Sequence, residues 1–198
     1  MWSFLKNLSS IIFIDDVEFE LSTRPFKSEK FGIPIFSGSL LTPELSHIAL
    51  RAKEDNDLIA RKYLAKLISQ AIGLLDLNEI CVVPIPSRIE ADRKRGFAHI
   101  DALLGEVAKS NKIVIFDILS HTRKIKDQSG LKIDERFRNL TGAFQVKTSK
   151  KVLPNSVFLI DDLITTGATI QAAAAALQVR NIQLLGAISA CATFVFTE

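Results

Sequence analysis

The chain is predicted to fold as an α/β domain whose central, mostly parallel sheet is flanked by helices. Two observations support this. Apolar runs rich in strand formers alternate with segments whose apolar residues recur at helical spacing. The stretch 157–169 then joins an apolar strand, two carboxylates and a hydroxyl-rich turn, and an alanine-rich helix follows directly. Strands that alternate with helices indicate parallel pairing.

Length and composition limit the class of protein. The 198 residues are 47% apolar and 24% charged, which suits one domain with a real core and excludes a disordered chain. A net charge of +3 does not by itself indicate binding to duplex DNA. Cys81 and Cys191 both lie in apolar runs, so we expect buried thiols and no zinc site.

The first residues indicate a cytoplasmic protein without membrane insertion. They show no basic start followed by a small-residue cleavage site. The apolar run Leu8–Ile14 is interrupted by Ser9 and Ser10 and is too short to cross a bilayer.

The segment 1–75 is predicted to be helical and extended and to pack on a core formed by 76–198. A short helix is expected at Trp2–Leu8, and the alternation in Val17–Ser22 favours a strand or an extended arm. Thr42 followed by Pro43 is typical of a helix start. A longer helix is expected over Asp57–Leu75, where apolar residues recur on one face.

The core then begins with a buried strand, Ile80–Val83, which Pro84-Ile85-Pro86 ends because proline lacks an N–H for the sheet. A basic loop follows. The remaining expected elements are a helix over Phe97–Lys109, a strand over Ile113–Leu119, a short strand over Gly142–Val146, the strand Val157–Ile160, and at least one strand within Ile182–Phe196.

The stretch 157–169 carries the chemistry. In open α/β sheets, ligands bind beyond the carboxyl ends of the strands. A helix that begins after a glycine turn offers unpaired N–H groups and a positive dipole end to a phosphate. The carboxylates of Asp161 and Asp162 suit hydroxyls or a metal ion. Phosphate at one end and polyol at the other describe a sugar phosphate.

Other interpretations of this stretch remain open. Paired aspartates after an apolar strand also occur in metal-binding receiver domains. A Thr-Thr-Gly sequence can be no more than a helix cap and a turn. A Walker loop is excluded, because no Gly-Lys-Ser/Thr sequence closes the turn.

Basic residues gather in two loops that are expected on the same sheet edge. Arginine grips phosphate oxygens with its planar fork, and lysine adds a point charge. A sugar with a terminal phosphate and a second, more highly charged phosphate group would satisfy both loops and the acidic motif, and phosphoribosyl pyrophosphate (PRPP) has this shape. Alternatively, these side chains are only solvated surface charges. The first loop holds Arg88, Arg93, Lys94 and Arg95, and the second holds Arg123, Lys124, Lys126, Lys132, Arg136 and Arg138.

The stretch 157–169 resembles the PRPP-binding motif of type I phosphoribosyltransferases, and the wider pattern resembles the ComF branch, proteins of bacterial competence and DNA uptake. The matching pieces occur in the family's order and cover about Leu41 to the end. They are Val83-Pro84-Ile85-Pro86, Arg95-Gly96-Phe97, Gln128 with Leu131, Arg136 and Asn139, Gly142-Ala143-Phe144, Ile160-Asp161-Asp162, and Thr165-Thr166-Gly167-Ala168-Thr169.

The resemblance implies a type I phosphoribosyltransferase-like fold with an N-terminal hood and a role for each motif. Asp161 and Asp162 would hold the ribose hydroxyls, with Mg²⁺ nearby on the pyrophosphate side. Catalysis would rest on positioning and on charge stabilisation of the leaving pyrophosphate. The implied 5′-phosphate loop is Thr165, Thr166, Gly167, Ala168 and Thr169; the implied pyrophosphate loop includes Pro86, Ser87, Arg88, Arg93 and Arg95; the implied flexible lid includes Arg123, Lys124, Gln128, Arg136 and Asn139.

The sequence departs from the ComF pattern at two places. ComF proteins usually carry an N-terminal four-cysteine zinc finger, and no cysteine precedes Cys81 here. The Arg-Gly-Phe piece is usually followed by Asn-Gln, where this chain has Ala98 and His99. We interpret His99 as a polar helix residue rather than a catalytic base, because the sequence shows no partner for it.

Three functions follow as hypotheses. The first is an enzyme that transfers phosphoribose from PRPP to a base or amine. The second is a non-catalytic regulator or adaptor that binds PRPP or a nucleotide, for which the resemblance implies a competence helicase or a recombination protein as partner. The third is weak binding of single-stranded DNA by the two basic loops, which the scarcity of aromatic residues near them disfavours. The sequence shows no recognisable base-binding pocket in 1–75.

Overall fold

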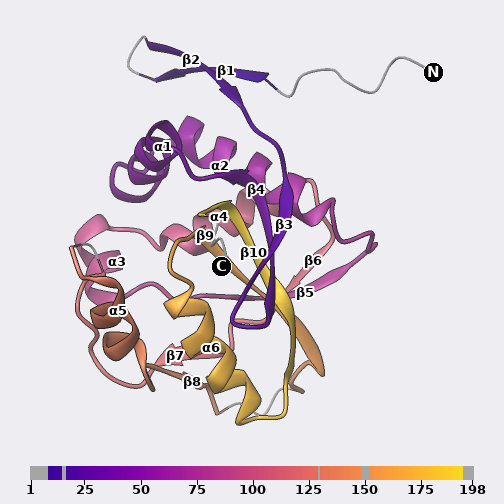
Figure 1. The fold of residues 1–198 in the computed structure, drawn as a ribbon, viewed down its shortest axis with the longest axis vertical. Helices are drawn as coiled ribbons and strands as arrows, with labels where there is room; N and C mark the ends of the chain where they lie inside the picture. Colours follow the sequence, from indigo (N-terminus) through magenta and orange to yellow (C-terminus); the bar gives the residue numbers. More distant parts are fainter. Residues whose placement is uncertain (1–8, 15–16, 129, 149–151, 194–198) are drawn as a thin grey trace.

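A computed structural model describes residues 9–14, 17–128, 130–148 and 152–193. Its centre is a six-stranded sheet with the order β3-β4-β10-β9-β5-β6 (Figure 1). Every pair in it is parallel except β3 with β4. The strands are β3 (Phe26–Lys30), β4 (Ile33–Leu40), β5 (Ile80–Pro84), β6 (Ile113–Ile115), β9 (Ser156–Ile164) and β10 (Gln183–Ala192). The predicted α/β class with a central, mostly parallel sheet is confirmed.

Helices cover both faces of this sheet. Apolar side chains of α1 (Pro43–Glu54), α2 (Leu58–Ile72) and α4 (His99–Val107) pack against one face. On the other face, α6 (Ala168–Gln178) and the two-stranded sheet of β7 (Leu119–His121) and β8 (Phe144–Val146) form a second buried cluster (Figure 1). The central strands are apolar on both sides because both sides are covered.

Local sequence signals set most of these elements. Thr42 caps α1 as expected, since its hydroxyl accepts a hydrogen bond from the Leu45 N–H at 3.3 Å. Asp57 caps α2 in the same way through the N–H groups of Ile59 and Ala60. Both cysteines are free thiols, Cys191 buried and Cys81 partly so.

Four local predictions differ from the structure. The strand expected over Ile113–Leu119 is two separate strands, β6 and β7. The strand of the acidic motif does not end at Ile160, because β9 continues to Ile164 and contains both aspartates. The two basic loops each contain a helix, α3 (Ile89–Arg95) and α5 (Ile133–Leu140).

The N-terminal part of the chain takes part in the central sheet. β3 forms one edge of it, and β4 lies between β3 and β10. Ahead of them, β1 (Ser9–Ile14) and β2 (Val17–Ser22) pair as an antiparallel hairpin. The helix predicted over Trp2–Leu8 lies outside the described residues. None of the helices in the described ranges combines the length and apolar character that a membrane crossing needs.

Candidate functional site

A cleft of about 410 Å³ lies at the carboxyl ends of β5 and β9. Its walls come from α1, from the segment after β5, from α4, from the segment after β7 and from the turn after β9. Parallel strands with reversed crossovers leave such a crevice at their carboxyl ends. The sheet therefore gathers segments that are far apart in the sequence around one space.

The predicted phosphate loop forms the turn between β9 and α6 and the first two residues of α6. Gly167 has φ +81° and is the N-cap of α6, so the N-cap residue itself has no side chain to cap the first N–H groups of the helix. Such a helix start leaves N–H donors available for an anion. The Thr166 hydroxyl already accepts one hydrogen bond within the protein, from the Ala168 N–H at 3.3 Å. Thr165 and Thr169 line the cleft.

The turn between β3 and β4 packs on this phosphate loop. The buried Lys30 ammonium donates hydrogen bonds to the Thr165 carbonyl and to the Thr193 hydroxyl. A Cβ at Gly167 would lie 3.1 Å from a ring carbon of Phe31 and 3.2 Å from the Lys30 stem. Burial lowers the pKa of Lys30. The N-terminal segment therefore fixes the loop from one side.

The two aspartates face opposite sides of the sheet. Their neighbours show this, since Phe158 and Ile160 pack with α1, α2 and α4, whereas Val157 and Leu159 pack with α6. Side chains alternate along a strand, so Asp162 joins the first set and Asp161 the second. Asp162 is 5% exposed and Asp161 is half-buried. Both line the cleft.

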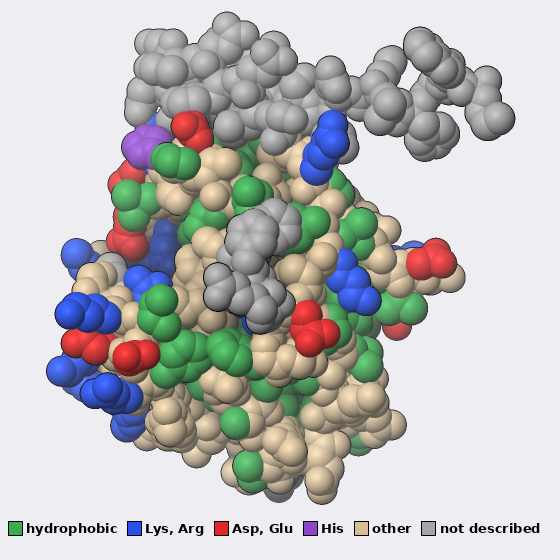
Figure 2. Space-filling view, in the orientation of Figure 1, with side chains coloured by type: hydrophobic (Ala, Val, Ile, Leu, Met, Phe, Trp, Pro, Cys, Tyr) green, Lys and Arg blue, Asp and Glu red, His purple; other side chains and the backbone are tan. Residues whose placement is uncertain are grey.

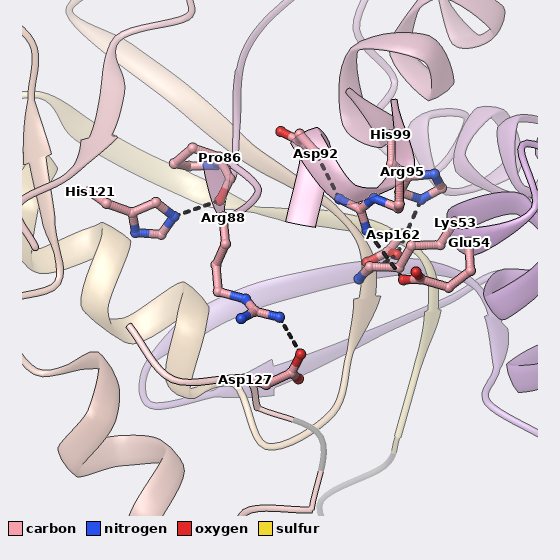
Figure 3. A network of polar contacts seen from close by, with 10 residues as sticks. All are labelled: Lys53, Glu54, Pro86, Arg88, Asp92, Arg95, His99, His121, Asp127 and Asp162. Atoms are coloured by element: carbon pink, nitrogen blue, oxygen red, sulfur yellow. Dashed lines mark hydrogen bonds and ion pairs between the residues drawn. The ribbon is translucent and has the colours of Figure 1, made fainter. Parts of the chain in front are cut away.

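Both carboxylate oxygens of Asp162 have partners within the protein (Figure 3). One oxygen accepts a hydrogen bond from the Leu163 N–H at 2.8 Å. The other lies 3.4 Å from the Lys53 ammonium of α1 and 3.3 Å from His99 Nε2 of α4. Asp161 accepts a hydrogen bond from the Asp162 N–H at 2.9 Å and has no such cationic neighbour at contact distance among the described residues.

These settings move the pKa values of the pair in opposite directions. Burial acts to raise the pKa of Asp162, but the charges of Lys53 and His99 outweigh it and hold that pKa below its usual range. Burial, with the neighbouring Asp162 carboxylate, raises the pKa of Asp161 well above its usual value. The Asp162 carboxylate raises the pKa of Lys53, so this ammonium stays charged.

The predicted pyrophosphate loop reaches the cleft with four of its five named residues. Pro86, Ser87, Arg88 and Arg95 line it, whereas Arg93 is exposed on α3 and is not part of the lining. The Arg95 guanidinium is buried and donates to Asp92 at 2.6 Å and to Glu54 at 3.4 Å (Figure 3). Arg88 pairs with Asp127 of the predicted lid.

The predicted lid divides into residues that face the cleft and residues that hold the segment together. Gln128 lines the cleft, and Arg136 of α5 donates to the Thr165 hydroxyl at 3.3 Å. Arg123 instead donates to the Asn139 carbonyl at 3.0 Å, and the Asn139 side chain hydrogen-bonds the Lys126 backbone in both directions. Lys124 is exposed and lies 3.4 Å from Glu90 of α3.

Unpartnered polar atoms gather around the cleft. Arg95 Nε, His121 Nδ1, His99 Nδ1 and both amide atoms of Gln128 are shielded from solvent and make no hydrogen bond in the described part of the chain. All four residues line the cleft. Buried polar groups usually have partners, so such a concentration indicates a place where a polar ligand completes the hydrogen bonding.

Four residues of the site were not predicted as such. Lys53 belongs to none of the predicted motifs, and His99 was interpreted only as a polar helix residue. Lys30 and His121 carried no signal, and His121 Nε2 lies 3.0 Å from the Pro86 carbonyl and so supports the loop after β5. The Arg-Gly-Phe piece is followed by Ala98 and His99; this departure from the ComF pattern could have drawn attention to His99.

Magnesium has only a partial fit at this site. Within the described ranges, no three Asp, Glu, His or Cys side chains form a group that could hold a metal ion. Magnesium usually takes one or two carboxylates together with substrate phosphates. Each oxygen of Asp162 already has a partner, and one partner is the Lys53 ammonium. The pair therefore does not fit an ion held by both carboxylates, and only Asp161 could meet one.

Basic side chains also cover the outer side of the site. Figure 2 shows Lys and Arg side chains gathered, with some acidic ones among them, on the side that carries α3 and α5. Exposed members are Arg93, Lys94, Arg123, Lys124 and Lys126. Binding of single-stranded DNA to this side stays a prediction.

Comparison with known proteins finds a limited likeness among solved structures. No family model matches the chain, and no curated protein matches it. Among solved structures, hypoxanthine phosphoribosyltransferase from Staphylococcus aureus matches with 14% identity and a TM-score of 0.34 over 65% of this chain. The match spans 62% of that protein's length. What the site can do is therefore argued from its own residues.

Proposed function

We propose that the protein binds PRPP in this cleft and is a phosphoribosyltransferase of the type I kind. The observation that carries the proposal is that the separate predicted segments border the same cleft. The turn 165–169, the Asp161 carboxylate and the Arg88 loop, which suit a phosphate, a ribose and a pyrophosphate, border one cleft of about 410 Å³. The unpartnered atoms of Gln128 and Arg95 lie on the same walls.

The proposed orientation follows from these positions. The 5′-phosphate lies on the turn before α6, where the N–H groups and the Arg136 side chain reach it. The ribose hydroxyls meet Asp161. The pyrophosphate meets the loop after β5, and the arginines there stabilise the charge that grows on it as the bond to ribose breaks. Asp162 positions Lys53 and His99 in this proposal, whereas the resemblance implies that it holds ribose hydroxyls together with Asp161.

An apolar part of the cleft favours transfer over simple binding. Leu50 of α1, Ile100 of α4 and Leu163 of β9 also line it. A wall of this kind accommodates the flat face of a base, while a few polar groups orient it. The acceptor site that the sequence did not reveal in 1–75 would thus come partly from α1.

Calorimetry with PRPP tests the binding step. We expect the parent protein to bind PRPP and Asp161→Asn to bind it at least about ten-fold more weakly, since a carboxylate–hydroxyl contact contributes on the order of 1.5–3 kcal/mol. Exposed Asp101 provides a matched control, because Asp101→Asn removes the same charge outside the cleft. Absence of PRPP binding by the parent protein would contradict the proposal.

A pyrophosphate-release assay across a panel of bases and amines then separates the enzyme from the regulator. Release with one acceptor class, lost in Asp161→Asn, supports transfer. Binding without release across the panel would favour a PRPP-binding adaptor. The ComF resemblance extends the proposal to DNA uptake with a helicase or recombination partner, and the resemblance of the motifs is its support.

A further inference from the structure

Lys53 is the cation of the cleft that has most freedom to meet a ligand. The cleft is lined by three Lys and Arg side chains, Lys53, Arg88 and Arg95, within the described parts of the chain. Arg95 is 3% exposed and forms ion pairs with both Asp92 and Glu54. Arg88 is paired with Asp127. The Lys53 side chain is 41% exposed, and its ammonium contacts Asp162 at 3.4 Å.

Asp162 fixes the position of this ammonium. It is anchored through the Leu163 N–H, and His99 Nε2 lies against the same oxygen that faces Lys53. An ammonium has three donors, so one contact with Asp162 leaves donors that can point into the cleft. Figure 3 shows Lys53, Asp162 and His99 converging from different elements. The result is a positive charge held at the acidic motif, the place near which the resemblance implies Mg²⁺.

The same arrangement disfavours a divalent cation beside Asp162. An incoming Mg²⁺ would meet the Lys53 ammonium, and like charges repel strongly where water is partly excluded. The carboxylate charge that would attract the metal ion is already paired with the Lys53 ammonium. The diphosphate of the ligand still needs positive charge to offset its own, and Lys53 can supply it directly.

We propose that Lys53 binds the diphosphate group of the ligand and replaces a divalent cation there, so that this protein binds diphosphates without Mg²⁺. The inference rests on the proposed function for its placement of the diphosphate. It adds a binding residue on α1 that the motifs do not contain, and it gives His99 and Asp162 the task of positioning that residue.

The test measures the affinity of inorganic pyrophosphate, PRPP and ribose 5-phosphate by calorimetry, in EDTA and in Mg²⁺. The parent protein is expected to bind pyrophosphate in EDTA within about ten-fold of its affinity in Mg²⁺. Lys53→Met is expected to weaken pyrophosphate binding in EDTA at least about ten-fold, the size of one lost charge-assisted contact. Lys53→Arg should keep most of the affinity, because it keeps the charge.

Two controls separate this effect from misfolding and from net charge. Ribose 5-phosphate lacks the diphosphate, so its affinity should be the same in Lys53→Met as in the parent protein. Lys62 is exposed on α2 and lies outside the cleft, so Lys62→Met should bind all three ligands as the parent does.

The outcomes distinguish the inference from the proposed function. If pyrophosphate binds only with Mg²⁺, or if Lys53→Met binds it as well as the parent does, the inference is wrong even when PRPP binds. If pyrophosphate binds in EDTA through Lys53 but neither PRPP nor ribose 5-phosphate binds, the inference stands and the proposed function falls. Failure to bind pyrophosphate under either condition overturns the inference.

Discussion

Asp161 and Asp162 show how strongly position on a strand determines what an identical side chain does. Strand alternation directs Asp162 toward α1 and α4, where Lys53 and His99 meet it. Asp161 faces the other way and has no such cationic contact within the described residues. The charged form of Asp162 is thereby stabilised in the folded protein, whereas the charged form of Asp161 is destabilised.

Asp162→Asn should destabilise the protein at neutral pH. The free energy of unfolding should fall by about 1–3 kcal/mol, because Lys53 and His99 lose the carboxylate that faces them. The folded-state pKa of Asp162 is lowered, so its contribution is present above the unfolded pKa of about 3.9 and is lost as pH falls through the folded pKa. In urea unfolding, the free energies of unfolding of parent and variant should therefore differ at pH 7, and this difference should narrow below about pH 4. A difference that does not change with pH would contradict this assignment.

Asp161→Asn should have the opposite effect on stability. The folded-state pKa of Asp161 is raised. The stability that its protonated form contributes is therefore present at low pH and is lost as pH rises through that pKa. Asparagine removes the destabilised charge, and the free energy of unfolding should rise by about 1 kcal/mol at pH 7 with little change at pH 4. The same urea series measures it. Equal destabilisation by both asparagine variants would show that the two carboxylates share one environment.

At the scale of elements, the β3–β4 turn and the start of α6 depend on each other. Gly167 has φ +81°, and a Cβ added there would meet the Phe31 ring and the Lys30 stem. Gly167→Ala should lower the free energy of unfolding by about 1–2 kcal/mol, since an L-residue is strained there. Ribose 5-phosphate affinity should fall with it, because the loop must move to admit the methyl group.

Gly105 offers a matched control for that substitution. It lies inside α4, and a Cβ there meets nothing within 4 Å. Gly105→Ala should raise the free energy of unfolding by about 0.5–1 kcal/mol and leave ribose 5-phosphate affinity unchanged. Chemical denaturation with calorimetry measures both. If the two alanines had the same effect, the turn would not constrain the loop.

Lys30 links the same two elements by hydrogen bonds. Lys30→Met should weaken ribose 5-phosphate binding by about ten-fold, because the Thr165 carbonyl loses its ammonium partner and the loop loses its fixed position. Lys27 is exposed on the same strand, with its ammonium over the Phe36 ring. Lys27→Met should bind ribose 5-phosphate as the parent does. Calorimetry measures both affinities. Equal weakening by the two variants would show that losing any lysine of β3 lowers the affinity, and that the contact of Lys30 with Thr165 is not the cause.

The sequence predicted the elements whose boundaries depend on residues close by in the chain. It did not predict those whose boundaries depend on residues far away in the chain. The start of α1 at Pro43 follows from Thr42 and Pro43 themselves. Extension of β9 through Asp161 and Asp162 does not, because these polar residues are accommodated by β10 alongside and by Lys53 across the cleft. Helices α3 and α5 were missed because their charged residues have the composition of a loop.

The same division applies to the site. The phosphate turn and the acidic pair are consecutive in sequence, so their motif is visible there. Lys53 lies 109 residues before Asp162, and Lys30 lies 135 residues before Thr165. Only the fold brings such pairs together, so no spacing rule could reveal them.

At the scale of the whole molecule, the central sheet joins an early strand of the chain, β4, to its last described strand, β10. β4 pairs with β10, and α2 packs on both strands. Gly38 of β4 lies directly against the α2 backbone, since a Cβ there would lie 2.1 Å from the Leu67 carbonyl oxygen. A backbone contact cannot be relieved by a side-chain rotation, so a methyl group at Gly38 must push α2 away from the sheet.

Gly38→Ala should therefore destabilise the whole molecule in one transition. Overpacking of this kind costs on the order of 3 kcal/mol, which corresponds to a fall in Tm of about 6–12 °C for a chain of this size. Because α2 covers β4 and β10 together, amides of β9 and β5 should lose hydrogen-exchange protection along with those of β4. Scanning calorimetry and hydrogen exchange measure the two effects. A first transition confined to residues before 76, with β5 and β9 still protected, would instead show that the N-terminal segment unfolds as a unit of its own.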